Sequence, residues 1–138
     1  IKKIEMNLII REHIWGKYDK AFKEIDALLK PNSVGKLKRH ARHLYIILLD
    51  LKKLSITRDE FVQCMNDCGI GTGVHYKAIH LHDYYKKKYS YERGNFKNAE
   101  WISDRTLSLP LSPYLTEQDT DNVINTVKEI INIHRKSF

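Results

Sequence analysis

The apolar residues of the first 29 positions repeat at helical spacing and set the strongest limit on the fold. The repeat follows alternating four- and three-residue steps and is formed by Ile1, Ile4, Leu8, Trp15, Tyr18, Phe22, Ile25 and Leu29. Such a stripe predicts one long amphipathic helix with one buried face. Pro31 and Gly35 end it. No capping residue precedes Ile1, so we expect the sequence to begin inside a helix of a larger protein.

Shorter apolar segments alternate with helical patterns along the rest of the chain and predict an α+β domain. The run 44–49 predicts a buried strand. Thr57 and Glu60 form a capping box for the next helix, which Gly69 ends in a left-handed conformation. Later segments predict a strand over 70–76, a helical turn over 83–88, and a helix capped by Asn95 with Ala99, Ile102 and Thr106 on one face. A strand over 107–111 follows, which Pro110 confines to an edge or an end of the sheet. Thr116 and Asp119 form the capping box of the last helix.

Length and composition suit one globular domain. A chain of 138 residues with 42% apolar and 30% charged residues is typical of a folded protein and excludes wholesale disorder. The longest uncharged apolar run, 44–49, is too short to span a bilayer. Charged residues interrupt the first segment, so no secretory signal is expected. Cys64 and Cys68 share one helix face, where a bridge constrains little, which favours free thiols in a reducing, cytoplasmic compartment.

The formal net charge of +7 predicts an anionic partner, which is nucleic acid, a phosphate group or an anionic membrane surface. Lys86, Lys87 and Lys88 lie among four tyrosines, a composition that suits stacking on nucleic-acid bases. No helix-turn-helix, zinc-finger or RNA-binding motif accompanies them. A basic nucleic-acid-binding module built around 75–93 therefore stays an alternative, beside a plain solvated surface.

Residues 71–85 concentrate the polar side chains that carry chemistry, including three of the seven histidines and three of the eight tyrosines. Gly71 and Gly73 allow a backbone to approach a ligand closely, although a solvated loop at a strand end explains the same composition. A metal site could use His75, His80 and His82, with or without Cys64 and Cys68, but these spacings match no established zinc motif. No dinucleotide fingerprint and no Ser/His/Asp arrangement is visible, so we expect no self-sufficient catalytic site.

Three segments resemble the C-terminal part of the DegT/DnrJ/StrS family of pyridoxal-phosphate-dependent sugar-nucleotide aminotransferases. They are 69–85 with its glycine–His–Tyr motif, the run AEWISDR at 99–105, and the run SLPLSP at 108–113. The resemblance is strongest to the branch that makes UDP-4-amino-4-deoxy-L-arabinose. It covers essentially the whole chain, and the motifs are specific in this order and separation although each is weak alone.

The resemblance implies the small C-terminal domain of an aspartate-aminotransferase-like enzyme of fold type I. Residues 1–30 would be a long helix leading in from a large domain that lies upstream, and 36–138 would be the small α+β domain. The implied reaction passes an amino group from an amino acid, usually glutamate, through pyridoxal phosphate to a keto-sugar nucleotide. Such enzymes are cytoplasmic homodimers that serve surface polysaccharide or lipopolysaccharide biosynthesis. We also expect the stripe of the first helix to be too long for this domain to cover, so that the isolated chain self-associates.

The resemblance also implies which residues meet the substrate. His75 and Tyr76 match the family's pair that faces the active site, and His80 matches the next histidine of that motif. An imidazole and a phenol can bond sugar hydroxyls or phosphate oxygens, and Lys77 adds charge for a diphosphate. We expect no catalytic, cofactor-binding or metal-binding residue in this chain, because the Schiff-base lysine lies upstream. Relatives that lose this lysine act as sugar dehydratases or non-catalytic sensors with the same fold, and these remain alternatives.

Overall fold

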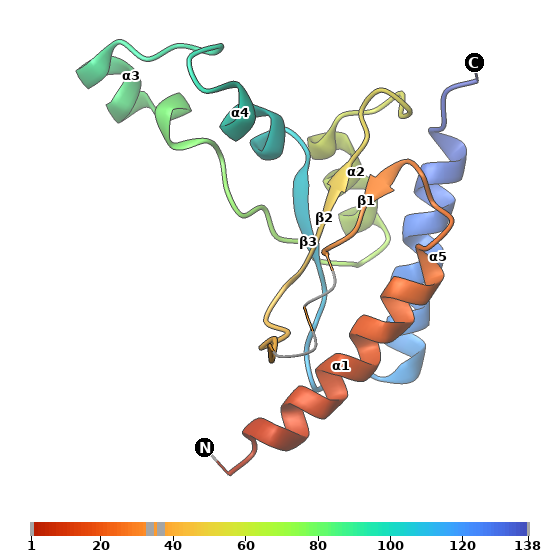
Figure 1. Ribbon diagram of the computed structural model, residues 1–138. Coiled ribbons are helices and arrows are strands. Elements are labelled where there is room, and N and C mark those ends of the chain that lie inside the picture. Colours follow the sequence, from red (N-terminus) through yellow and green to blue (C-terminus); the bar gives the residue numbers. More distant parts are fainter. Residues whose placement is uncertain (1, 33–34, 36–37, 138) are drawn as a thin grey trace.

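The structure is a computed structural model that describes residues 2–32, 35 and 38–137 (Figure 1). Ile1, the first residue of the apolar stripe, lies outside the described residues. The elements follow the chain as α1 (Ile4–Ala21), β1 (Leu28–Leu29), β2 (Tyr45–Leu49), α2 (Arg58–Asp67), the short 3-10 helix η1 (Ile79–Leu81), α3 (Asp83–Tyr89), α4 (Lys97–Ser103), β3 (Thr106–Leu109) and α5 (Glu117–Ile133). The predicted α+β class is confirmed.

The first helix is shorter than the stripe predicts. α1 ends at Ala21, and Leu28 and Leu29 pair with the end of β2 instead of continuing the helix. The helical spacing of Leu29, the last stripe residue, is therefore a coincidence that tertiary pairing overrides. Most of the stripe is covered, because Leu8, Trp15, Tyr18 and Phe22 are buried and α5 packs against α1 (Figure 1). Ile4 is exposed, so the expectation that this domain cannot cover the whole stripe is confirmed at its first part, and self-association stays a prediction.

The sheet is antiparallel with the order β1-β2-β3, so β2 is central. β2 and β3 pair in a register that places Tyr45 opposite Leu109. Alternate residues of β2, namely Tyr45, Ile47 and Leu49, are buried on one face. β3 is an outer strand that ends directly before Pro110, which confirms the prediction from this proline.

The prediction of a strand over 70–76 is wrong, because this segment forms one isolated bridge, between Gly73 and Ser108, instead of a strand. In an antiparallel ladder, the next hydrogen-bonded pair beyond this bridge would join Gly71 to Pro110. Proline has no backbone N–H and cannot complete that pair. Pro110 therefore stops the ladder on the Gly71 side of the bridge, and residues 74–76 on its other side form no ladder with β3 either.

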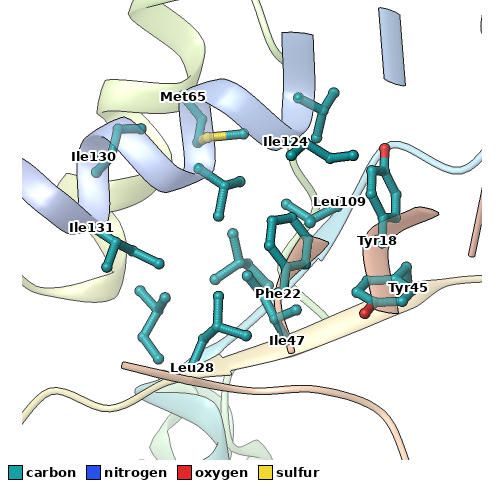
Figure 2. Close-up of a cluster of buried hydrophobic side chains, with 14 of the residues drawn as sticks. Tyr18, Phe22, Leu28, Tyr45, Ile47, Met65, Leu109, Ile124, Ile130 and Ile131 are labelled. Atoms are coloured by element: carbon teal, nitrogen blue, oxygen red, sulfur yellow. The ribbon is translucent and has the colours of Figure 1, made fainter. Parts of the chain in front are cut away.

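The helices α1, α2 and α5 pack their apolar faces on the buried face of the sheet (Figure 2). Both predicted capping boxes are present, with Thr57 and Glu60 at α2 and with Thr116 and Asp119 at α5. Gly69 has a φ of +74° and ends α2, as predicted. The apolar face of α5 is buried and includes Val123, Ile124, Val127, Ile130 and Ile131. Among the described residues, no helix is long and apolar enough to cross a membrane.

Two features of α4 differ from the prediction. Asn95 does not cap this helix, since its side-chain oxygen accepts the backbone N–H of Glu92 at 2.8 Å. The predicted face of Ala99 and Ile102 is exposed, and Thr106 belongs to β3. Instead α4 turns Glu100 inward, where backbone N–H groups and a histidine bond its carboxylate. The helical turn predicted over 83–88 is present as α3.

Candidate functional site

The two most specific sequence motifs, which are more than thirty residues apart, meet at the outer edge of β3. Gly73 and Ser108 exchange backbone hydrogen bonds of 3.2 Å and 2.7 Å. The His75 imidazole lies beside this bridge, with Nε2 3.0 Å from the Ser108 hydroxyl. A Cβ at position 73 would lie 2.6 Å from this nitrogen and 2.9 Å from the hydroxyl. Only glycine therefore lets His75 and Ser108 close over the bridge.

The hydrogen bonds around Ser108 assign the tautomer of His75. The Ser108 hydroxyl lies 3.3 Å from the carbonyl oxygen of Gly73, which can only accept. The hydroxyl therefore donates to Gly73, and the His75 Nε2–H donates to the hydroxyl. This leaves Nδ1 as an acceptor, which is buried and has no partner among the described residues. Buried polar atoms normally have a partner, so we expect a water molecule or a group outside this chain to donate to Nδ1.

The residues that follow His75 open onto a groove. Tyr76 is 74% exposed, and its ring stands edge-on to that of His75, with centroids 5.0 Å apart. The groove has a volume of about 680 Å³, and its lining is mostly aromatic and aliphatic. We call it the aromatic groove. Its lining residues come from three segments and include Tyr76 and Lys77, then Tyr85 and Tyr89 of α3, and Ile102 of α4.

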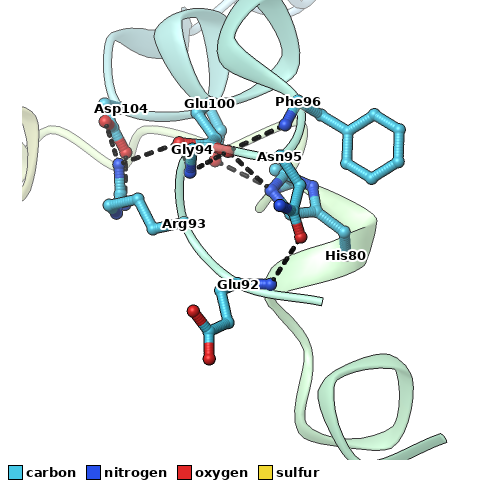
Figure 3. A network of polar contacts seen from close by, with 10 residues as sticks. His80, Glu92, Arg93, Gly94, Asn95, Phe96, Glu100 and Asp104 are labelled. Atoms are coloured by element: carbon cyan, nitrogen blue, oxygen red, sulfur yellow. Dashed lines mark hydrogen bonds and ion pairs between the residues drawn. The ribbon is translucent and has the colours of Figure 1, made fainter. Parts of the chain in front are cut away.

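His80 lies at the inner side of the aromatic groove and is fixed by Glu100 (Figure 3). The imidazole Nε2 lies 2.9 Å from the Glu100 carboxylate, and the two residues are only 5% and 6% exposed. The carboxylate also accepts the backbone N–H groups of Gly94 and Phe96. This Glu100 clasp ties the loop 90–96 to η1 and α4. His80 therefore supports the groove wall, and its Nε2 is already bonded to Glu100.

The clasp keeps Glu100 ionised. Burial acts to raise the pKa of its carboxyl, but the hydrogen bonds from Gly94, Phe96 and His80 outweigh burial and hold the pKa below the ordinary 4.5. Arg93 supports the same loop by a two-pronged pair with Asp104, with N–O distances of 2.7 Å and 3.0 Å. The wall of the aromatic groove is therefore anchored at both ends by charged hydrogen bonds.

The metal site and the nucleic-acid-binding surface that the sequence left open involve other residues, whose geometry is as follows. Within the described ranges, no three His, Cys, Asp or Glu side chains are close enough to share a metal ion. His75 and His80 bond Ser108 and Glu100 instead, and Cys64 and Cys68 are both free thiols. The lysines of α3 are exposed, and Lys88 Nζ lies within 5.4 Å of the ring centres of Tyr84 and Tyr89.

The sequence interpretation missed Ser108 and Glu100 as parts of the site. Both lie inside the motifs that carried the family resemblance, so their positions were visible but their roles were not. An acidic residue in the first turn of a helix normally indicates a dipole interaction rather than a buried clasp. A contact between residues 75 and 108 depends on the fold and leaves no periodic signal.

Comparison with known proteins gives the family. The model of the DegT/DnrJ/EryC1/StrS aminotransferase family matches residues 1–128. The chain is 43% identical over 122 residues to the spore coat polysaccharide biosynthesis protein SpsC of Bacillus subtilis, which covers 88% of this chain and 31% of SpsC. It is 38% identical over 135 residues to the uncharacterized protein MJ1066 of Methanocaldococcus jannaschii, which covers 98% of this chain and 35% of that protein.

A solved structure has the same fold. The PLP form of the putative sugar aminotransferase Spr1654 from Streptococcus pneumoniae superposes with a TM-score of 0.84 at 25% identity, over 96% of this chain and 33% of Spr1654. The chain thus spans about a third of the length of the relatives it matches. The expected small α+β domain of an aminotransferase of fold type I is confirmed. This chain belongs to the DegT/DnrJ/EryC1/StrS aminotransferase family.

Proposed function

We propose that this chain is the C-terminal small domain of a pyridoxal-phosphate-dependent enzyme that aminates a keto-sugar nucleotide, with glutamate as the amino donor. The observation that carries the proposal is the loop 75–77, which the Gly73–Ser108 bridge fixes at one end and which opens onto the aromatic groove at the other. The similarity to the spore coat polysaccharide biosynthesis protein SpsC supports a product destined for a surface polysaccharide, and lipopolysaccharide is the other destination that we propose. The parent protein would act in the cytoplasm.

The proposed roles follow from the chemistry and the exposure of each residue. Tyr76 and Lys77 are exposed, so their phenol and ammonium groups can bond a sugar hydroxyl and a diphosphate. His75 is held in one tautomer by Ser108, and its Nδ1, which has no partner among the described residues, can accept a donor from the substrate. His80, which Glu100 holds in place, supports the wall of the aromatic groove on the side that faces the proposed substrate.

The residues of this chain do not fit the cofactor. Pyridoxal-phosphate chemistry requires a lysine that forms a Schiff base, usually inside an enclosed site. The described lysines are exposed apart from three half-buried ones, Lys17, Lys30 and Lys53. Each of these three pairs with a carboxylate, at Glu117, Asp19 and Asp26 respectively. We therefore assign the cofactor to the remainder of the parent protein.

The parent protein would act as a homodimer in this proposal. The support is three large apolar side chains in the first turns of α1, Ile4, Met6 and Ile9, which are exposed in the isolated chain. An exposed cluster of large apolar side chains is typical of a surface that another chain covers.

The test uses the full-length parent protein with glutamate and a panel of keto-sugar nucleotides. We expect 2-oxoglutarate and the amino-sugar nucleotide to form in equal amounts. The isolated chain is the matched control, and with added pyridoxal phosphate it should give neither product nor a borohydride-reducible absorbance at one of its lysines. Loss of water from the sugar without amination would replace this proposal with the dehydratase alternative.

A further inference from the structure

The segment 38–43, which leads toward β2, is strongly basic. Five of its six residues are Lys, Arg or His, and no Asp or Glu occurs between Asp26 and Asp50. The segment lies against α1, far from the helices α3 and α4 at the other end of the molecule (Figure 1). Clustered positive charge attracts anions, but a solvated basic run is common, so the contacts of this segment decide what it can bind.

A small pocket lies between this segment and α1. Its lining includes Glu5 and Arg11 of α1 and Arg39, His40 and Ala41 of the segment, and we call it the basic pocket. Its volume is about 270 Å³, whereas pockets for whole small molecules have roughly 300 to 1,000 Å³. The basic pocket therefore suits a compact charged group rather than a complete sugar nucleotide.

Within the part of the chain that the structure describes, no carboxylate pairs with the Arg11 guanidinium. Glu5 pairs with Arg39, and Glu12 lies beside Arg42 at 3.9 Å. Arg11 donates one long hydrogen bond of 3.4 Å to a backbone carbonyl, and its Nε is buried with no partner among the described residues. A half-buried charge costs free energy unless other charges or hydrogen bonds compensate it, so Arg11 favours an anionic ligand.

His40 is fixed in the tautomer that can donate from Nε2. Its Nδ1 accepts the backbone N–H of Arg42 at 2.9 Å, so the proton of the neutral ring lies on Nε2. The Trp15 ring packs beside the imidazole, with centroids 5.2 Å apart. The Arg42 guanidinium lies over the same indole, 4.5 Å from its centre. These contacts hold the segment on α1 before any ligand arrives, which lowers the ordering cost of binding.

We propose that the basic pocket binds a phosphate-type dianion between Arg11 and His40, with Arg39 at its rim. The planar fork of a guanidinium matches two phosphate oxygens, and the imidazole N–H adds a further donor. The proposal goes beyond the proposed function, because the pocket lies apart from the aromatic groove and needs no sugar nucleotide.

Glu5 competes with such an anion for Arg39. The hydrogen bond from Arg39 holds the pKa of the Glu5 carboxyl below the ordinary 4.5, so Glu5 is ionised at neutral pH. Both side chains are exposed, so their ion pair is weak and an incoming dianion can replace the carboxylate. Removing the Glu5 charge should therefore strengthen anion binding.

The first experiment titrates the 138-residue chain with inorganic phosphate at constant ionic strength and follows backbone and arginine side-chain N–H signals by NMR. We expect saturable millimolar binding with shifts in 5–11 and 38–43, and no such shifts with chloride. Arg11→Gln should weaken phosphate binding about tenfold or more. Lys52→Gln removes the same charge from an exposed side chain outside the pocket lining, and its affinity should stay within about twofold.

A second pair of variants tests the competition. Glu5→Gln should tighten phosphate binding about threefold, the effect of losing one exposed ion pair. Glu24→Gln makes the same change in net charge at a side chain that is 88% exposed and outside the pocket lining, so it should leave the affinity unchanged. Circular dichroism shows whether each variant is folded. Absence of saturable shifts in the wild type overturns the proposal, and so does wild-type affinity in folded Arg11→Gln or, if that variant does not fold, in Glu5→Gln.

The remaining outcomes identify the source of the anion. Glycerol 3-phosphate that binds more tightly than inorganic phosphate would assign the pocket to phosphate monoesters, and weaker binding would assign it to the free ion; both keep the proposal. Equilibrium dialysis of the full-length parent against labelled phosphate should show binding that Arg11→Gln removes. If the isolated chain binds phosphate at this pocket and the parent does not, a carboxylate of the parent occupies it and the proposal is overturned.

Discussion

Replacing Gly73 by alanine probes the contact that joins the two motifs of the site. The added Cβ would lie 2.6 Å from His75 Nε2 and 2.9 Å from Ser108 Oγ, closer than real Cβ atoms approach. The His75 ring is the movable partner, because its nitrogen is at the far end of a side chain. We therefore expect the ring to rotate away and the hydrogen bond to Ser108 to be lost, while the Gly73–Ser108 backbone bridge is kept.

The expected cost is modest because a side chain, rather than the backbone, moves. Losing one hydrogen bond costs about 1 kcal/mol of unfolding free energy. In a domain of this size that loss lowers the melting temperature by roughly 4 °C. Gly71→Ala is a matched control two residues away, since a Cβ there has no neighbour within 4 Å. We expect its effect to stay within about 0.5 kcal/mol.

Urea unfolding of the wild type, both alanine variants, Ser108→Ala and the Gly73→Ala/Ser108→Ala double variant measures this contact. The cost of Gly73→Ala should shrink in the Ser108→Ala background, because the hydrogen bond is already absent there. The NMR signals of the His75 ring should move in Gly73→Ala and stay in place in Gly71→Ala. Equal costs at positions 71 and 73, with an unmoved His75, would refute the reasoning.

Three further predictions concern stability. Leu54→Ala removes a buried core side chain and should cost about 2 to 5 kcal/mol in urea unfolding, whereas Ile133→Ala on the exposed side of α5 should cost less than about 0.5 kcal/mol. Thr57→Ala removes the α2 cap and should cost about 1 kcal/mol, and a neutral result would contradict the cap. Hydrogen bonds from Thr57 and Thr116 hold the pKa of Glu60 and Asp119 below the ordinary 4.5 and 3.8. Their stabilisation is therefore present above those values and lost as the pH falls through the lower folded pKa, so Glu60→Gln should flatten acid unfolding.

Local signals predicted the helices α2 and α5 well. A capping box, a left-handed glycine and a 3.6-residue apolar repeat are all properties of neighbouring residues, and Thr57, Gly69 and Thr116 act as expected. Pairing between distant segments was the weak point. Leu29 continues the helical spacing of the stripe but lies in β1, because β2 offers it a partner.

The sequence singled out the loop that borders the groove but not its supporting contacts, and the substrate roles of His75, Tyr76, Lys77 and His80 stay predictions. The exposed Tyr76 and Lys77 lie beside the groove, next to the loop that the sequence singled out. The Glu100 clasp could not be predicted, because it joins a helix to a loop and to His80 through groups that are 4 to 20 residues apart in the chain. Asn95 is a residue type that often caps a helix, but its side-chain oxygen accepts the backbone N–H of Glu92 instead.

The most direct test of the central claim, that the loop 75–77 contacts the sugar nucleotide, is to measure the two half-reactions of the full-length parent protein separately. In single-turnover experiments, His75→Ala should slow the half-reaction with the keto-sugar nucleotide by about tenfold or more, the loss expected from one or two hydrogen bonds. The half-reaction with glutamate should stay within about twofold of the wild type, as should both half-reactions of the Gly71→Ala control. Equal slowing of both half-reactions by His75→Ala would contradict the claim and would leave His75 with a structural role only.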